Sequence, residues 1–142
     1  MTKKTRLIPG INIQWPWGEL IVSGQKTIET RGYDIPEKYR GIEIAVIQTP
    51  GPRGRKEAGI LKACIIGTVV FEKTIRYKSE TQWKKDFDRH RVPASDPTYK
   101  FNPNKEKWGW TVKQVSKLPK SMPPPKKRGI VFATACVITG QD

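Results

Sequence analysis

The sequence predicts an α+β domain in which five or six mostly antiparallel strands form a closed or half-closed small barrel with two or three short helices. Three observations carry this prediction. Short apolar clusters recur along the chain and are separated by glycine and proline. Most clusters have the composition and length of strands, and few segments show helical spacing. The 142 residues suffice for one hydrophobic core but not two, so a single domain is expected over residues 1–142.

The first helix is expected close to the N-terminus. A short strand in "IPGINIQ" should lead into a helix in "WPWGELIVSG", because Trp17, Leu20 and Ile21 recur at helical spacing. Gly24 then stands where a left-handed C-cap belongs. A strand over Gln25–Arg31 should follow, in which alternate residues share one face.

The middle of the chain is expected to alternate strands with loops. Ile42–Thr49 is a strand with an apolar centre, and Pro50–Gly59 is a basic, glycine-rich loop that should be mobile. Ile60–Tyr77 is one long or bent strand, with a bulge or kink at Gly67. A second helix is expected in "SETQWKKDFDRHR", which opens with the S-x-x-Q pattern of a capping box.

Two further strands are expected in the C-terminal part. Val92–Lys105 should be a long irregular loop. A strand in "EKWGWTVKQVSKL" follows, and strand alternation puts Trp108 and Trp110 on the same side. A loop in "PKSMPPPKKRG" then leads to a closing strand over Ile130–Ile138.

The charge balance favours a polyanionic partner. Lysine and arginine total 27 against 13 aspartates and glutamates, a net charge of +14. Such an excess on a small domain is typical of proteins that contact nucleic acid, because each neutralised phosphate releases counterions. Basicity that serves only solubility is the alternative. Residues 1–8 are basic and lack periodicity, and are expected to form a flexible tail.

Other chemistries find little support. A single histidine rules out a His-rich metal site, and no P-loop, Gly-x-Ser-x-Gly elbow or dinucleotide fingerprint is present. Cys64 and Cys136 match no metal motif and are expected to be buried thiols in a reducing compartment. The sequence has no signal-peptide core and no bilayer-length apolar run. A cytoplasmic protein without a metal or another cofactor is therefore expected.

His90 has two interpretations. Asp86 lies one turn before it and could orient it as an acid or base. The preferred alternative is a histidine at a helix C-terminus, favoured by the helix dipole and packed beside Trp83 and Phe87. Most of the five tryptophans are likewise expected in the core, with one or two exposed to a ligand.

Three charged residues, Lys26, Glu29 and Arg31, stand close together in "VSGQKTIETRGY". Glu29 and Arg31 share a strand face and can pair, whereas Lys26 sits at the junction with the preceding helix. Spacing alone leaves two interpretations open, a self-neutralising surface strand and a charged site.

Several sequence landmarks follow one another along the chain. They are the pair Pro16 and Trp17, the G-x-K-x-x-E-x-R pattern from Gly24 to Arg31, the pair Arg40 and Gly41, the Gly109–Trp110 strand, and the Pro-rich loop before Gly129. In this order they resemble the ASCH domain, a branch of the PUA-like β-barrel superfamily. The resemblance covers nearly the whole chain, from about Ile11 to Ile138.

The resemblance implies a PUA-like barrel with a cleft beside the first helix. Because the superfamily mostly binds RNA or modified bases, it also implies a nucleic-acid-binding domain that recognises a base or nucleotide, with RNA as the expected partner. Cations can hold a phosphate or a base carbonyl, and a carboxylate can accept a hydrogen bond from an exocyclic amine. The expected cleft residues are Trp17, Lys26, Glu29, Arg31 and Trp110.

An enzyme is the second interpretation. The resemblance includes one bacterial branch of the family whose members are amidohydrolases. These enzymes remove the acetyl group from N4-acetylcytidine with a lysine, a threonine and a glutamate. Another branch of the family is reported as nucleolytic. The lysine maps onto Lys26, but the threonine maps onto Glu29, and the catalytic glutamate has no clear counterpart. If the chain is a hydrolase, Lys26 and Glu29 are the expected catalytic residues, with Lys26 as base or nucleophile.

The remaining expectations concern partners. Exposed basic residues should contact phosphates without reading sequence, and the candidates are Arg40, Arg53, Arg55, Lys56, Lys126, Lys127 and Arg128. Each could instead be a solvated surface charge. A third possibility is a protein-interaction or coactivator module that docks through "PKSMPPPKKR". A monomer is expected, with no membrane partner.

Overall fold

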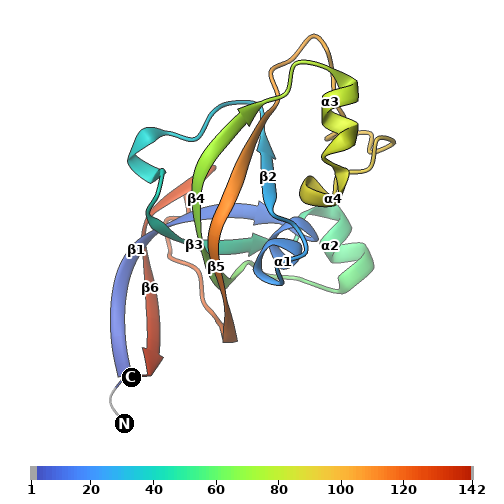
Figure 1. The fold of residues 1–142 in the computed structure, drawn as a ribbon. Helices are drawn as coiled ribbons and strands as arrows, with labels where there is room; N and C mark the ends of the chain where they lie inside the picture. The colour runs from blue at the N-terminus through green and yellow to red at the C-terminus, as the bar shows by residue number, and fades with distance from the viewer. Residues whose placement is uncertain (1–2, 142) are drawn as a thin grey trace.

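The computed structural model describes residues 3–141 of the chain. In this range one mixed sheet of six strands is accompanied by four short α-helices (Figure 1). The strands are β1 (Lys3–Gln14), β2 (Ile28–Arg31), β3 (Glu43–Thr49), β4 (Cys64–Arg76), β5 (Trp108–Met122) and β6 (Phe132–Gln141). The helices are α1 (Trp17–Val22), α2 (Gly51–Ala58), α3 (Glu80–Lys85) and α4 (Phe87–His90), and a 3₁₀ turn spans Glu37–Tyr39.

The strand order in the sheet is β2-β5-β4-β3-β1-β6. Only β1 and β3 pair in parallel among the described strands, so the predicted α+β class and mostly antiparallel sheet are confirmed. The predicted barrel closure is not seen. β2 and β6 are the two edges of the sheet, and the described residues form no ladder between them. Figure 1 shows β2 beside β5 and β6 beside β1, at opposite edges of the sheet.

The core lies between α1 and the concave side of this sheet. Trp110 of β5 has no exposed surface and contacts Phe71 of β4 edge to face, with ring centroids 5.7 Å apart. Trp17 and Ile21 of α1 belong to the same buried cluster. A smaller cluster of Ala45, Ile47, Ile65, Ala133, Cys136 and Ile138 lies on the opposite face of the sheet, since Ala45 and Ile47 alternate along β3 with Ile44 and Val46 of the main cluster. Large aromatic side chains dominate such a core because they bury the most area per residue.

Helix α1 ends as the sequence predicts. The backbone of Ser23 donates to the carbonyl of Glu19, and Gly24 follows with φ of +84°. This left-handed conformation suits glycine because it lacks a Cβ. The chain therefore turns sharply after α1, and Lys26 is the second residue beyond the turn.

Gly67 of β4 marks an irregularity in the sheet, also as predicted. The register of both neighbouring strands shifts beside it. A Cβ at this position would lie 2.5 Å from the carbonyl oxygen of Ser116 and 2.7 Å from Val22. Because both contacts are closer than atoms can approach, the glycine allows α1 and β5 to pack against β4.

Two segments predicted to be mobile or flexible form regular secondary structure. The expected mobile loop Pro50–Gly59 contains helix α2, in which Gly54 packs against Trp15 and Gly59 ends the helix with φ of +65°. The expected flexible tail is ordered over residues 3–8, which lie in β1 and pair with β6; residues 1 and 2 lie outside the described range. Both errors have one cause: the stabilising partner is distant in sequence, so local composition does not reveal it.

The second predicted helix is divided into two. Ser79 caps α3 by accepting a hydrogen bond from the backbone of Gln82, at 3.1 Å, as the capping pattern predicts. Asp86 then separates α3 from α4, and Arg91 follows α4 with φ of +64°. No helix in the described residues is long and apolar enough to cross a membrane.

Candidate functional site

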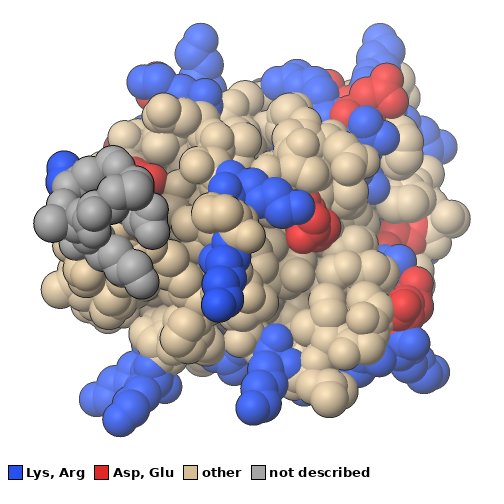
Figure 2. All heavy atoms as spheres, turned by 90° about the horizontal axis from the view of Figure 1, so that it is seen from below, with Lys and Arg blue, Asp and Glu red and all other residues tan. Residues whose placement is uncertain are grey.

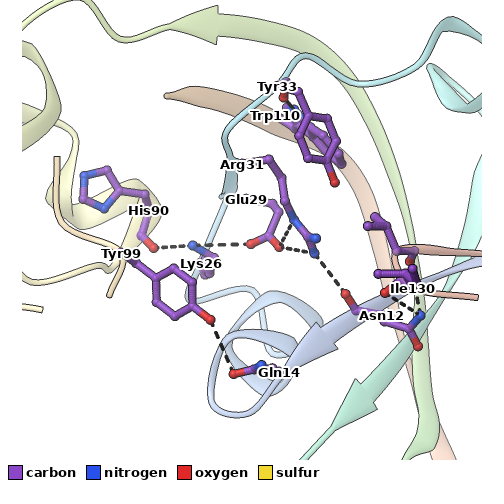
Figure 3. Close-up of polar contacts among 11 residues, drawn as sticks. Asn12, Gln14, Lys26, Glu29, Arg31, Tyr33, His90, Tyr99, Trp110 and Ile130 are labelled. Carbon is purple, nitrogen blue, oxygen red and sulfur yellow. Dashed lines mark hydrogen bonds and ion pairs between the residues drawn. The ribbon is translucent and has the colours of Figure 1, made fainter. Parts of the chain in front are cut away.

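A cleft of about 290 Å³ opens beside α1, at the ends of β1 and β2 (Figure 3). Five segments that are distant in sequence form its walls: the end of β1, the stretch from α1 through β2, the end of β3, the loop after α4, and the turn before β6. Its lining residues are Asn12, Ile13, Gln14, Trp17, Lys26, Glu29, Thr30, Arg31, Thr49, Val92, Tyr99, Arg128, Gly129 and Ile130.

Lys26 forms the inner end of the cleft. Its backbone N–H donates to the carbonyl of Leu20, at 2.9 Å, which ties it to the end of α1. Its side chain is 1% exposed, and its Nζ donates to the backbone carbonyl of His90 and lies 5.2 Å from the ring centre of Trp17. The charged end is thus held by a carbonyl and an aromatic face, an arrangement that compensates part of the cost of burial.

Glu29 lies between two cations. One carboxylate oxygen, Oε1, is 3.7 Å from the Nζ of Lys26. The other, Oε2, accepts hydrogen bonds from the Nε and Nη2 of Arg31, at 3.1 and 2.9 Å (Figure 3). Arg31 Nη2 also donates to the backbone carbonyl of Asn12 in β1, at 3.0 Å. The three charged residues form the floor of the cleft, and this charged floor has a formal charge of +1 when Lys26 is protonated.

The pKa of Lys26 is lowered from 10.5 to about 8. Burial is the main cause, since it disfavours the charged ammonium. The Glu29 carboxylate opposes this effect, whereas the charge of Arg31 adds to it. Lys26 is therefore mostly protonated at pH 7, but a neutral amine is within reach of mildly alkaline pH.

His90 is a packed, neutral residue. Its ring stacks on Trp83 with centroids 3.6 Å apart, so the predicted packing beside an aromatic is seen. Its Nδ1 accepts from the backbone N–H of Val92, at 2.9 Å, which leaves Nε2–H to donate to the carbonyl of Trp83, at 2.8 Å. Burial lowers its pKa to about 4, so the charge expected from the helix dipole is absent near neutral pH. Asp86 accepts instead from the hydroxyl of Tyr77, at 2.6 Å.

The two tryptophans expected in the cleft lie differently. Trp17 lines the cleft. The ring of Tyr99 contacts the ring of Trp17 edge to face, with centroids 6.1 Å apart. Trp110 lies beneath the floor: its Nε1 donates to the carbonyl of Tyr33, at 3.0 Å, and the Arg31 guanidinium lies 5.8 Å from its ring centre. Trp110 thus supports the charged floor from the core and does not line the cleft.

The predicted phosphate contacts occupy three places. Arg128 lines the cleft, and Lys126 and Lys127 precede it in the same loop with exposed side chains. The second place is the surface of α2, where Arg53, Arg55 and Lys56 are exposed. The third is Arg40, whose guanidinium is bound within the fold by Asp34, Glu37 and the carbonyl of Glu72. Its partners give Arg40 a structural role.

The surface charge is spread widely. On the face shown in Figure 2, lysine and arginine side chains project around the whole outline, and aspartate and glutamate side chains are fewer. Positive charge therefore surrounds the molecule in this view without forming one continuous patch. Such a distribution attracts polyanions from many directions.

Sequence reasoning missed several lining residues. Asn12 and Gln14 lie at the end of β1, Val92 and Tyr99 come from the irregular loop, and Ile130 belongs to the turn before β6. The Tyr99 hydroxyl lies 3.4 Å from the side-chain oxygen of Gln14 (Figure 3). None of these residues belongs to a charged or catalytic motif. Only the folded chain brings them to one place.

Comparisons with known proteins agree on one family. The ASCH domain model matches residues 11–119. The crystal structure of ASCH from Zymomonas mobilis superimposes with a TM-score of 0.60 and 16% identity, covering 81% of this chain and 72% of the other. A serine-to-alanine mutant of that protein gives a TM-score of 0.64 and 14% identity, covering 89% of this chain and 86% of the other. No curated protein sequence matches the chain.

Proposed function

The chain belongs to the ASCH domain family, and on this premise we propose that it binds RNA and recognises a base or nucleotide in the cleft above Lys26, Glu29 and Arg31. One observation carries the proposal. A carboxylate shared by a buried lysine and a partly exposed arginine forms the floor of a cleft in a chain with net charge +14. This pairing of positive potential with fixed polar groups suits an anionic, polar ligand.

The chemistry of the floor supports a nucleotide in particular. Arg31 uses its Nε and Nη2 to hold Glu29 and Asn12, and its guanidinium has further N–H donors at Nη1 that can meet a phosphate or the edge of a base. Glu29 offers acceptor capacity for an exocyclic amine. Trp17 and Tyr99 add aromatic surface at the side of the cleft, against which a base can pack. A cleft of about 290 Å³ is at the small end of ligand pockets, a size suited to one nucleotide.

The exposed basic residues support an extended partner. Lys126, Lys127 and Arg128 adjoin the cleft, and α2 carries a second basic group of side chains. Contacts from such residues position the backbone of a strand without reading its sequence. The base specificity would then come from the cleft.

Fluorescence anisotropy with a short single-stranded RNA tests the proposal. Binding should weaken steeply as salt is raised from low to physiological concentration, with a log-log slope set by the number of neutralised phosphates. A strand of identical length made of DNA serves as the comparison, since RNA should bind more tightly. Absence of RNA binding at low salt would refute the nucleic-acid proposal.

Hydrolysis of a modified pyrimidine is a second candidate, favoured by the lowered pKa of Lys26. An amine of pKa about 8 can act as a base in amide cleavage. Glu29 works against this role because it favours the ammonium form. We expect no release of cytidine from N4-acetylcytidine at pH 7. Release that rises with pH through about 8, and is lost in Lys26→Met, would place the enzyme first.

A further inference from the structure

The turn before β6 presents a bulky apolar side chain at the rim of the cleft. Ile130 is 96% exposed, more than the other exposed large hydrophobic residues of the described chain, and it lines the same cleft as Arg31. One residue, Gly129, separates it from the basic run Lys126, Lys127 and Arg128. An exposed isoleucine alone needs no explanation, but one at the edge of a charged cleft marks surface that a ligand can bury.

The structure holds this turn in place. The side-chain Nδ2 of Asn12 lies 3.2 to 3.4 Å from the carbonyl oxygens of four successive residues, from Arg128 to Val131. The backbone N–H of Asn12 also donates to the carbonyl of Val131, at 2.8 Å. Gly129 has φ of +69°, and a Cβ there would collide with the carbonyl of Phe132. The outward position of Ile130 thus follows from an ordered turn.

Asn12 connects this turn to the charged floor. Its own carbonyl accepts the hydrogen bond from Arg31 Nη2, at 3.0 Å, while its side chain holds the carbonyls of the turn (Figure 3). One residue of β1 therefore sets the position of Arg31 relative to Ile130. The floor and the rim form one arrangement in which charged groups lie inside and an apolar group lies at the edge.

We infer that Ile130 packs against the base next to the one held in the cleft, so that the partner is an unpaired stretch of at least two nucleotides. This inference rests on the proposed function. Arg128 beside it supplies the charge complementary to the intervening phosphate. A paired neighbour could not present its face to Ile130, because that face is stacked within the duplex. Apolar side chains contact unstacked bases in this way in other nucleic-acid complexes.

Comparing a single nucleotide with a short strand tests the inference. The dissociation constants of a nucleoside monophosphate and of a single-stranded eight-nucleotide RNA are measured for the full chain by calorimetry and anisotropy. Ile130→Ala should weaken binding of the eight-nucleotide RNA roughly five- to tenfold and weaken binding of the monophosphate clearly less, because only the strand provides the neighbouring base. Ile130→Phe should keep or improve the affinity for the strand, because an aromatic ring stacks on a base.

Two controls make the result specific. Leu61→Ala removes another exposed apolar side chain, 76% exposed and absent from the cleft lining, and should change neither affinity. Placing the same eight nucleotides in a fully paired duplex should weaken binding by tenfold or more. Circular dichroism confirms that each variant is folded.

Several outcomes overturn the inference. Ile130→Ala with wild-type affinity for the strand would show that the side chain makes no contact. Equal losses for monophosphate and strand would place Ile130 on the nucleotide in the cleft. Duplex binding as tight as single-strand binding would refute an unpaired partner. If the wild-type chain binds neither the monophosphate nor the strand, the proposed function itself fails.

Discussion

The Nζ of Lys26 lies 3.7 Å from the Oε1 of Glu29, and the two side chains are only 1% and 6% exposed. The other carboxylate oxygen is occupied by Arg31. Two cations thus share one anion in a region with little water. Because burial of an unpaired charge is costly, removing any one of these residues should destabilise the burial of the other two. The two cations exceed the one anion, which leaves the floor of the cleft with a net positive charge.

Glu29→Gln should destabilise the protein. The variant leaves Lys26 and Arg31 close together without a carboxylate, and breaking a buried ion pair typically costs about 3–5 kcal/mol. Urea denaturation at pH 7 measures the change in the free energy of unfolding. Glu106→Gln is the matched control, because its ion pair with Arg76 is about half exposed and should contribute less than about 1 kcal/mol. Similar losses in both variants would contradict a buried charged floor.

The stability difference between wild type and Lys26→Met should depend on pH. The Lys26 pKa falls from 10.5 to about 8 on folding, so between these values the unfolded chain binds more protons than the folded one. Wild-type stability therefore gains from this lysine as the pH rises from 8 to 10.5, and the variant lacks that gain.

Denaturation at pH 7.5 and pH 10.5 measures this effect. The difference should shift in favour of wild type by roughly 2–3 kcal/mol between the two pH values. Lys113→Met, which removes an exposed lysine paired with Glu72, should show no comparable shift. A pH-independent difference for Lys26→Met would mean that the lysine keeps its ordinary pKa.

The free energy of unfolding should decrease at acidic pH because His90 is held neutral in the folded protein. Its pKa falls from 6.5 to about 4 on folding, so its contribution to stability is complete above pH 6.5 and is lost as the pH falls towards 4. The physical reason is local: a proton on Nδ1 would face the backbone N–H of Val92, which already donates to that nitrogen.

His90→Phe keeps an aromatic ring against Trp83 but cannot titrate. It should be less stable than wild type at pH 7, because two buried hydrogen bonds are lost. Its stability should fall less between pH 6.5 and pH 4, by roughly 2 kcal/mol. Thermal unfolding across this pH range distinguishes the two slopes. Parallel slopes would show that other groups, such as carboxylates, cause the acid sensitivity.

Changes at the rim and at the floor should affect RNA binding differently. Replacing Lys126, Lys127 and Arg128 by alanine should weaken binding to all sequences alike and flatten the salt dependence. Arg31→Lys keeps the charge but loses the planar pair of donors, so it should reduce the preference for one base over another. Anisotropy with four homopolymeric RNAs at two salt concentrations separates the effects. Identical behaviour of the two variants would argue against recognition in the cleft.

Elements whose cause is local can be predicted from the amino-acid sequence. The turn at Gly24, the cap at Ser79 and the irregularity at Gly67 each follow from one residue and its neighbours. The grouping of Lys26, Glu29 and Arg31 was also visible, because the three residues lie within six positions. The order of the family landmarks along the chain also indicates the ASCH domain.

The surroundings of these charges depend on long-range packing. The basic segment Pro50–Gly59 becomes α2 as Gly54 packs on Trp15, and β1 extends to Lys3 because β6 pairs with it. Lys26 is buried because its amine reaches the carbonyl of His90, 64 residues away. Contacts over such distances depend on the packing of whole elements, so local propensity does not contain them. The lowered pKa of Lys26, the neutral His90 and the exposed Ile130 beside the cleft all arise from that packing.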